Sequence, residues 1–338
     1  MVTRRSLLLG GAGLAGPVAA AWGSRRARAA GPARTFTFGY DQPHETGYGF
    51  MADTFDKKLQ ELSGGTLMIR QFPTAALGQE PEMAQKIRTG DIDFAINSTA
   101  NTATVVPQAG VFSLHYIFRD EGHLLRAVTN PGLNATFKKM IVDNTTGARS
   151  LGLMTLGFRN MYSKFTISSV RDIDGKKVRV QATKTEDAFF SAYHAVPIHM
   201  PFGQVYTSLQ TGLVQIAENS NDIYLKNKHY EAAPVLSKTQ HEANNNHLWM
   251  SQKTWESLTD EQRKWVQQAA DFALPRAALK SLEYDAAAAK TLQGLRVRYH
   301  DQVDKQSFAT LAAPLQGPQA ESLGPYAVQL LTLVRNLK

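Results

Sequence analysis

Apolar residues follow two alternating patterns between residues 35 and 96. Residues 35–40 and 67–72 predict strands, because apolar or aromatic side chains recur there with the short period of a strand. Residues 49–62 and 80–89 carry apolar side chains at helical spacing, and 92–96 predicts a third strand. The order strand, helix, strand, helix, strand implies parallel strands joined by right-handed crossovers, as in an α/β fold.

A second unit of the same kind is predicted to begin near Leu151. It shares the order of elements with the first unit, and no short repeat is visible. Its expected strands are 159–163, 177–181 and 214–217, and its expected helices are 186–195 and 202–210.

Residues 255–286 have a strongly helical pattern that we expect to break once, at Pro275, because proline removes a backbone donor. A chain of 338 residues also exceeds the size at which one core is usual, so two domains are expected. No segment after the N-terminus reaches the ~18 uninterrupted apolar residues of a membrane span, so the mature chain should be soluble.

The first 29 residues have the pattern of an export signal. A basic start is followed by an apolar stretch over residues 7–22, which is shorter than the ~20 residues that span a bilayer. Ala27 and Ala29 are small residues of the kind that a signal peptidase reads, so we expect cleavage near Ala29 and a periplasmic location. The pair Arg4-Arg5 resembles a twin-arginine signal.

The composition of the chain excludes several kinds of functional site and argues against one class of partner. The chain has no cysteine, which excludes disulfides, thiolate metal sites and cysteine nucleophiles. Five of its 37 basic residues lie in the first 29 positions, which leaves 32 basic residues against 29 acidic ones. These charges are interspersed rather than striped, so no nucleic-acid partner is expected.

Motifs of common enzymes are missing beyond the N-terminal signal, which itself holds Gly10, Gly11 and Gly13. No GxSxG, GxGxxG or GxxxxGK[ST] occurs there, and the nine histidines show no HExxH spacing. His241 and His247 flank Glu242, but no partner at ligand spacing is visible elsewhere. We therefore expect a polar strand or loop there, no metal, no cofactor and no catalytic activity.

In an open parallel sheet, ligands bind beyond the carboxyl ends of the strands. The loops of interest are those that follow the expected strands, after positions 40, 96, 181 and 217. They carry His44-Glu45, Asn97-Ser98-Thr99, Thr183-Lys184 and Glu218-Asn219.

Several short motifs, in order and at matching spacing, make the chain from about Phe36 to Val297 resemble the solute-binding subunit of a tripartite ATP-independent periplasmic (TRAP) transporter, of the dicarboxylate-binding type. The motifs are Ser63-Gly64-Gly65-Thr66-Leu67, Leu77-Gly78-Gln79-Glu80 with residues 87–94, Gly157-Phe158-Arg159, residues 172–180, and residues 201–212 followed by Val214 and Glu218-Asn219.

The resemblance implies a fold and a domain plan. The fold is the α/β, two-domain fold of periplasmic binding proteins, with a hinge-closing cleft and a long bridging helix that residues 255–286 would supply. Domain I would comprise 33–156 and about 245–285, and domain II would comprise 157–244 and about 286–338.

The resemblance also implies what the protein does. A small organic acid, which is a carboxylate, is captured in the periplasm and delivered to small and large integral membrane subunits that use an ion gradient. The family has no catalysis of its own, and a monomer is its usual state. Two alternatives are an exported binding protein that feeds a sensor or chemoreceptor, and an exported enzyme that acts on an organic acid.

Two arginines are implied at the ligand. Arg179 matches the family arginine that pairs with the ligand carboxylate, a role that suits a planar guanidinium fork that stays charged when buried. Arg159 matches a second arginine near the same carboxylate, and the two would repel each other until an anion binds and favours closure. The alternative for each is a structural ion pair or cap.

The remaining candidates follow from the same alignment of motifs. Asn219 would bond to the ligand, Phe202 would pack on its carbon skeleton, and Glu218 would either contact it or, as we favour, orient an arginine. The neutral residues near Asn97 and Ser98 argue against a sialic-acid-like ligand and favour a small hydroxylated or mono-acid one. The last two candidates, His44 and Glu45, would reach a distal hydroxyl or a second carboxylate.

Overall fold

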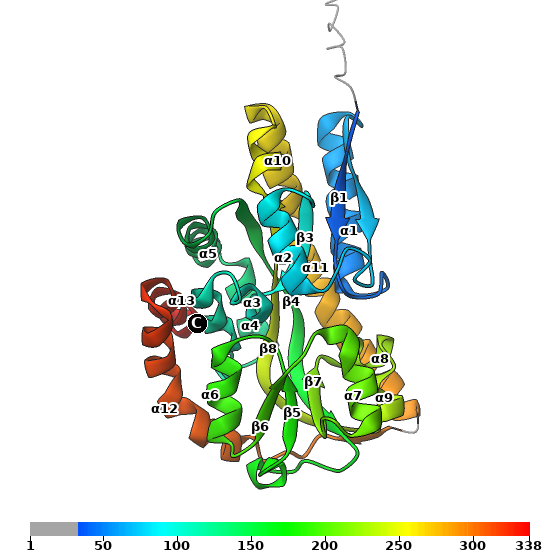
Figure 1. The fold of residues 1–338 in the computed structure, drawn as a ribbon, viewed down its shortest axis with the longest axis vertical. Coiled ribbons are helices and arrows are strands. Elements are labelled where there is room, and N and C mark those ends of the chain that lie inside the picture. The colour runs from blue at the N-terminus through cyan, green and yellow to red at the C-terminus, as the bar shows by residue number, and fades with distance from the viewer. Residues whose placement is uncertain (1–32, 296) are drawn as a thin grey trace, which may run out of the picture. The chain divides into compact units, whose positions relative to one another are not determined.

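A computed structural model describes residues 33–295 and 297–338, so the expected export signal at 1–29 lies outside the described residues. Within the described part, the strands form one mixed sheet of nine strands (Figure 1). The strands are β1 (Arg34–Gly39), β2 (Leu67–Phe72), β3 (Phe94–Ser98), β4 (Ala148–Ser163), β5 (Lys177–Val180), β6 (Val196–His199), β7 (Ile216–Asn219), β8 (Val235–Ser251) and β9 (Arg298–His300). Their order is β2-β1-β3-β8-β4-β7-β5-β6, and β9 pairs with β8.

Helices surround this sheet, and none of the described ones is both long and apolar enough to cross a membrane. The α-helices are α1 (Gly47–Ser63), α2 (Glu80–Thr89), α3 (Thr99–Thr102), α4 (Glu121–Thr129), α5 (Pro131–Asn144), α6 (Lys184–Ala192), α7 (Val205–Thr211), α8 (Asn221–Lys226), α9 (His229–Ala232), α10 (Gln252–Glu256), α11 (Asp260–Gly294), α12 (Lys305–Leu323) and α13 (Pro325–Asn336). Three 3₁₀ turns are η1 (Pro107–Ser113), η2 (Val170–Ile173) and η3 (Phe202–Gln204).

The first unit confirms the predicted βαβαβ order, because β1 pairs in parallel with both β2 and β3. Phe36 and Phe38 of β1 are fully buried and contact the ring of Phe94 on β3. The strand β3 begins two residues later than expected. Asp93 instead accepts hydrogen bonds from the backbone and hydroxyl of Thr37, which fixes the turn before β3.

The second unit differs from its prediction in several strands, and its last strand, β7, begins two residues later than expected. Its parallel strands are β5, β6 and β7, and β6 was not expected because the short sequence 196–199 includes a proline and lacks a buried pattern. The expected strand at 159–163 is the end of the longer β4, which runs antiparallel to β7 and β8.

The long strands β4 and β8 connect the two parallel units and position the central arginine. Their pairing shifts register between Thr155 and Phe158, where Gly157 adopts a φ of 95° that disfavours any residue with a Cβ. Beyond that irregularity Arg159 lies opposite Glu242. The Gly-Phe-Arg motif therefore serves to bring Arg159 to this point of the sheet.

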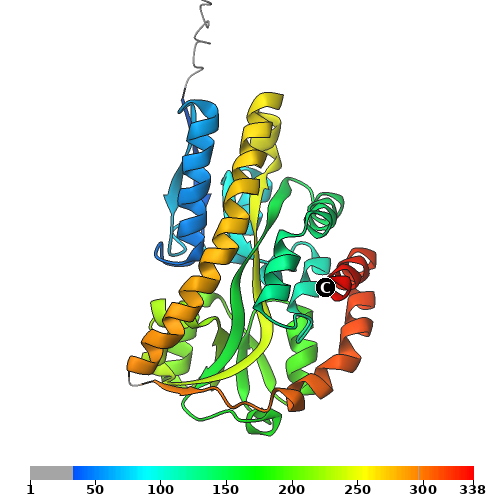
Figure 2. The ribbon, with the colours of Figure 1, turned by 180° about the vertical axis from the view of Figure 1, so that it is seen from behind.

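The predicted break at Pro275 is wrong, because α11 continues through this residue from Asp260 to Gly294. The carbonyl that loses its partner belongs to Asp271, an exposed residue, so water can replace the missing donor. The helix packs against α1, β4 and α8 (Figure 2), which matches the expected bridging helix.

Candidate functional site

A small pocket lies where the carboxyl ends of β1, β3, β5 and β7 meet, as the sheet rule predicted. One side, here called the acidic wall, is formed by Asp41, Tyr48, Glu80, Ser98 and Asn101. The other side, here called the arginine wall, is formed by Arg159, Arg179, Gln181, Phe202 and Asn219. Gln42, Leu156 and Asn244 complete the lining of a cavity of about 20 Å³.

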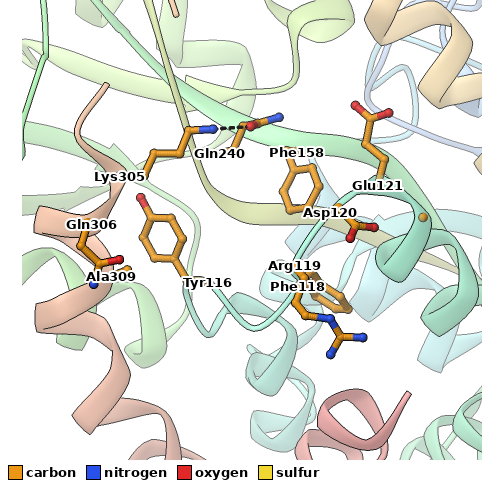
Figure 3. Close-up of a pocket in the computed structure, with 11 residues that line it drawn as sticks. Tyr116, Phe118, Arg119, Asp120, Glu121, Phe158, Gln240, Lys305, Gln306 and Ala309 are labelled. Carbon is orange, nitrogen blue, oxygen red and sulfur yellow. Dashed lines mark hydrogen bonds between the residues drawn. The ribbon is translucent and has the colours of Figure 1, made fainter. Parts of the chain in front are cut away.

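A larger pocket of about 570 Å³ contains none of the predicted ligand residues (Figure 3). Phe118 and Phe158 line its apolar part, and Lys305 donates a hydrogen bond to Gln240 at its edge. It lies beside the loop at Tyr116 rather than at the ends of the parallel strands, so we place the candidate site in the smaller pocket.

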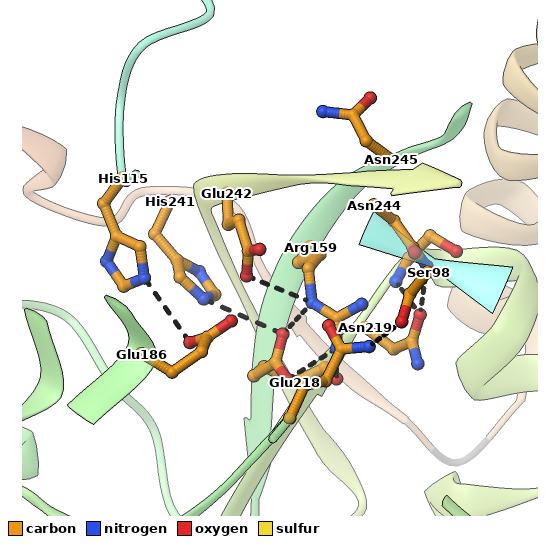
Figure 4. A network of polar contacts seen from close by, with 12 residues as sticks. Ser98, His115, Arg159, Glu186, Glu218, Asn219, His241, Glu242, Asn244 and Asn245 are labelled. Carbon is orange, nitrogen blue, oxygen red and sulfur yellow. Dashed lines mark hydrogen bonds and ion pairs between the residues drawn. The ribbon is translucent and has the colours of Figure 1, made fainter. Parts of the chain in front are cut away.

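Arg159 is buried and already paired with acidic side chains (Figure 4). Its Nε and Nη2 both donate to the carboxylate of Glu218, the latter at 2.6 Å, and Nη2 also donates to the Glu218 carbonyl at 3.1 Å. Glu242 lies 3.5 Å away on β8. Burial lowers the pKa of Arg159, but the two glutamates outweigh burial and raise it above its ordinary value.

Arg179 has a different environment on the neighbouring strand β5. Its side chain is 2% exposed, and its Nε and Nη2 donate to the carbonyl of Met200 at 3.2 and 3.0 Å. Burial lowers the pKa of Arg179 below its ordinary value and Arg159 lowers it further, while Glu218, 3.9 Å away, only partly opposes them. The charge of Arg179 is therefore much less compensated than that of Arg159.

Asn219 and Phe202 complete the arginine wall. The Asn219 side-chain oxygen accepts from the backbone of Ser220 and from the amide of Asn244, which fixes its orientation toward the pocket. The ring of Phe202 lies 5.8 Å from the Arg179 guanidinium carbon, and it offers an apolar surface to the pocket. Both predicted residues are thus brought beside Arg179.

Glu80 organises the acidic wall. Its carboxylate accepts from the hydroxyls of Tyr48 and Ser98, at 3.2 and 2.6 Å, and from the amide of Asn101 at 2.8 Å. Glu80 is only 3% exposed, so these bonds replace the hydrogen bonds that its carboxylate would otherwise make to water. Burial raises the pKa of Asp41 well above its ordinary value, and the nearby charge of Glu80 adds to the rise.

Four hydrogen bonds join the segments that carry the two walls, and one of them, between Gln181 and Ser98, connects the walls themselves. Each connects a residue of 42–101 to a residue of 181–227. They run from Gln181 Nε2 to Ser98 Oγ (2.8 Å), from Ala182 N to Asn101 Oδ1 (3.1 Å), from Gly203 N to Gln79 Oε1 (3.2 Å) and from Asn227 Nδ2 to Gln42 Oε1 (3.0 Å).

Four predicted residues do not line this pocket. His44 and Glu45 are exposed, and His44 pairs with Asp53 at 3.1 Å. The side chain of Asn97 is fully buried and donates to the Glu80 carbonyl. Glu218 lies beneath the pocket and holds Arg159, which is the supporting arrangement that the sequence analysis favoured.

Sequence reasoning found Ser98 but missed Asp41, Gln42, Tyr48 and Glu80 among the residues that line the pocket. Asp41 and Gln42 follow β1 directly, so the rule for strand ends could have found them before His44. Tyr48 and Glu80 lie at the first turns of α1 and α2, and no local signal marked their inward direction.

A second buried group of polar side chains lies behind Arg159, on the side away from the pocket (Figure 4). It consists of His115, Glu186, His241 and Glu242, all at most 3% exposed. Burial raises the pKa of Glu186 to about 7, with Glu218 adding to the rise, and it lowers the pKa of His115 to about 4. The imidazole of His115 is therefore neutral near neutral pH.

Comparison with protein families identifies the chain. Residues 38–321 match the family described as bacterial extracellular solute-binding protein, family 7. The uncharacterized protein YiiZ of Salmonella typhimurium is 30% identical over 264 residues, which cover 77% of this chain and 79% of that protein. The sialic acid-binding periplasmic protein SiaP of Vibrio cholerae is 27% identical over 253 residues, or 74% of this chain and 77% of that one.

Solved structures agree with this match. A TRAP periplasmic solute-binding protein from a Polaromonas species, bound to D-erythronate, has a TM-score of 0.84 at 25% identity and covers 90% of this chain and 99% of that one. Another from a Bradyrhizobium species, in complex with α/β-D-galacturonate, has a TM-score of 0.84 at 27% identity and covers 90% and 100%. The chain belongs to family 7 of the bacterial extracellular solute-binding proteins, the solute-binding subunits of TRAP transporters.

Proposed function

We propose that this protein captures a hydroxylated monocarboxylate of the sugar-acid class between its two walls and delivers it to TRAP membrane subunits. The observation that carries the proposal is the unequal charge of the pocket. Arg179 is buried on one wall without a bonded carboxylate, while Asp41 and Glu80 are buried on the other.

The carboxylate of the ligand would bind at Arg179. Arg159 already donates two hydrogen bonds to Glu218, so an incoming anion gains less there. A carboxylate beside Arg179 would supply the negative charge that this buried guanidinium lacks, through a short charge-assisted bond. Asn219 and the ring of Phe202 would bound the same end of the ligand.

The acidic wall favours hydroxyl groups at the other end of the ligand. Asp41 is bonded to Gln42 through one oxygen and retains acceptor capacity for a hydroxyl donor. A second carboxylate at this end would face Asp41 and Glu80, and it would bind only with an additional proton or cation. The pocket therefore selects sugar acids over dicarboxylates.

Ligands of related proteins support this chemistry. The relatives with solved structures include complexes with D-erythronate, β-D-galacturonate and α/β-D-galacturonate, each a monocarboxylate with several hydroxyls. The side chains near the end of β3 are neutral in this chain, and Ser98 and Asn101 are committed to Glu80. This part of the site has no cation for a further anionic group.

Binding and release would require the walls to separate. Ligand pockets are typically ~300–1,000 Å³, far larger than the cavity of about 20 Å³ between these walls. Opening would break the four hydrogen bonds across the pocket, and β4, β8 and α11 would act as the hinge between two domains. We place domain I at residues 33–156 and about 245–285, and domain II at 157–244 and about 286–338.

Export and oligomeric state complete the proposal. The mature protein would begin near Ala29, act in the periplasm as a monomer and have no catalytic activity of its own. His44 and Glu45, at the surface beyond the acidic wall, could contact a ligand only after that loop moved, so we assign the distal contacts to Asp41 and Gln42.

A thermal-shift screen tests the proposed class of ligand. Each sugar acid is paired with its neutral sugar and with the corresponding dicarboxylic acid, for example galacturonate with galactose and galactarate. Tight ligands raise the melting temperature by mass action. The sugar acid should therefore raise it, whereas neither the neutral sugar nor the dicarboxylic acid should. A larger shift with galactose or galactarate than with any monocarboxylate would refute the assignment.

A further inference from the structure

Two buried histidines far apart in the sequence point at the same space behind Arg159. The ring centroids of His115 and His241 are 4.8 Å apart. One donor atom from each histidine and one carboxylate oxygen of Glu242 lie within 4.8 Å of one another. Glu186 adds a fourth candidate ligand atom, an oxygen that lies 3.7 Å from His115 Nε2.

The inward-facing atoms of this group have no hydrogen-bond partner among the described residues. They are Nε2 of both histidines, both oxygens of Glu186 and Oε2 of Glu242. Glu186 and Glu242 can share one proton between their carboxyl groups, but the Nε2 atoms of both histidines stay unpaired. Buried polar atoms are almost always bonded, so these unpaired atoms indicate that something else fills this role.

The outward-facing nitrogens, in contrast, are held. His115 Nδ1 lies 2.9 Å from the hydroxyl of Tyr193, and His241 Nδ1 lies 2.9 Å from the hydroxyl of Thr239. A hydroxyl that accepts from Nδ1–H leaves Nε2 as the free lone pair. In metal sites, hydrogen bonds of this kind fix the tautomer and the ring orientation of the ligating histidines.

The charges of the region are unbalanced as well. The carboxylates of Glu186, Glu218 and Glu242 face two guanidinium groups: Arg159 pairs with Glu218 and Glu242, and Arg179 lies 3.9 Å from Glu218. Once an organic anion pairs with Arg179, two carboxylates remain without a cation. This last step rests on the proposed function, whereas the distances do not.

We propose that His115, His241, Glu242 and Glu186 form a binding site for a divalent transition-metal cation of the zinc class. Two imidazole nitrogens and two carboxylate oxygens are ligands that zinc accepts in tetrahedral sites. Tetrahedral zinc at ~2.0–2.2 Å from each ligand places the ligand atoms about 3.3–3.6 Å apart. Atoms that now lie within 4.8 Å of one another must therefore approach by up to about 1.5 Å, a movement shared between two side chains. Two carboxylates also balance the charge of one such ion.

His247, the other histidine of β8, has no free ring nitrogen for a metal. Its two ring nitrogens lie 2.8 Å from the Thr102 hydroxyl and 3.1 Å from the Ser150 hydroxyl.

From the sequence we expected no metal, because His241 had no visible partner at ligand spacing. His115 is the partner that the fold provides. Tyr116 and Gln240, the chain neighbours of these two histidines, line the larger pocket of Figure 3.

Titration calorimetry with zinc chloride alone tests the site. The chain without its expected export signal is prepared without a polyhistidine tag. Bound metal is removed with a chelator, and zinc is added in the absence of any organic acid. We expect one zinc ion per chain, confirmed by elemental analysis. His115→Gln and Glu242→Gln should each weaken binding by about 100-fold or more, since even supporting residues of metal sites contribute 10–100-fold.

The matched control is His199→Gln, which alters an exposed histidine paired with Asp187 at 2.6 Å and should leave zinc binding unchanged. An anomalous-scattering map of zinc-soaked wild-type crystals provides a test that does not depend on whether the variants fold. Stoichiometric zinc with an anomalous peak among the four side chains supports the proposal. Absence of zinc binding, or binding unaffected by the two cluster variants, would overturn it and leave a shared proton between Glu186 and Glu242. Neither result bears on sugar-acid binding.

Discussion

The guanidinium of Arg179 lies 3.9 Å from the carboxylate of Glu218, beyond hydrogen-bond distance. The same carboxylate is fully engaged by Arg159, whose Nε and Nη2 both donate to it. Two arginines with one shared acid are therefore not equivalent. Arg159 is held by hydrogen bonds to an acid, whereas Arg179 has no hydrogen-bonded carboxylate, and on the proposed function it is the residue that receives the anion.

Replacing Arg179 should remove most of the affinity for a sugar acid. Loss of one partner of a buried charge pair costs ~2–5 kcal/mol, or about 30-fold or more in Kd. Arg179→Lys should also bind more weakly, because a point charge does not reproduce the guanidinium fork. Calorimetry with the acid found in the screen measures both, and Arg70→Ala, at an exposed strand arginine, should bind as wild type does.

Asp41→Asn should reduce the selectivity of the pocket. Removing the acidic group from the distal end lowers the penalty for a second carboxylate, so the ratio of Kd for galactarate to Kd for galacturonate should fall. A loss of affinity for galacturonate itself is also expected, because the amide presents only one acceptor oxygen to the hydroxyls. An unchanged ratio would show that Asp41 does not face the distal end of the ligand.

Gln181→Ala should destabilise the closed form. Its side chain donates to Ser98 across the pocket at 2.8 Å, and a hydrogen bond of this kind contributes ~0.5–1.5 kcal/mol. The dissociation rate of the ligand, measured by stopped-flow fluorescence, should rise several-fold while the association rate changes little. Gln210→Ala, on the exposed face of α7, should leave both rates as in wild type.

Asp285 on α11 should make the folded state less stable as pH rises. Burial raises its pKa from 3.8 to about 7, so the folded chain holds a proton that the unfolded chain has lost between these values. The free energy of unfolding should therefore fall between about pH 4 and pH 7, by up to roughly 4 kcal/mol for this group alone. Denaturant unfolding across that range measures the slope.

The control for this slope is Asp285→Asn, which has no titrating group. The difference in unfolding free energy between wild type and variant should move in favour of the variant as pH rises, whatever the absolute stabilities are. A difference that stays constant with pH would show that Asp285 titrates at the same pH in both states.

The pattern of apolar residues was sufficient to predict the bounds of those helices and strands that are determined by their own residues. The bounds 67–72 and 80–89 agree with β2 and α2, because each segment buries one regular face and a glycine pair or turn precedes it. Pro275 misled the prediction, since the cost of one lost backbone bond is small beside the packing of α11 against α1 and β4.

The site was predictable only in part, for a physical reason. Arg159, Arg179 and Asn219 stand in motifs or at strand ends, so their position along the chain carried information about their place. Asp41 also follows a strand and Glu80 stands in a motif, but no local signal showed that both side chains face the same pocket. His115 meets His241 through tertiary packing alone, and spacing along the chain cannot reveal such a pair.

A crystal structure of the complex with a bound sugar acid tests the central claim most directly. The account predicts that the ligand carboxylate lies within hydrogen-bond distance of the Arg179 guanidinium, with hydroxyls toward Asp41 and with Arg159 still bonded to Glu218. A ligand whose carboxylate lies at the acidic wall, or whose carboxylate is bound by Arg159 after Glu218 has moved away, would contradict it.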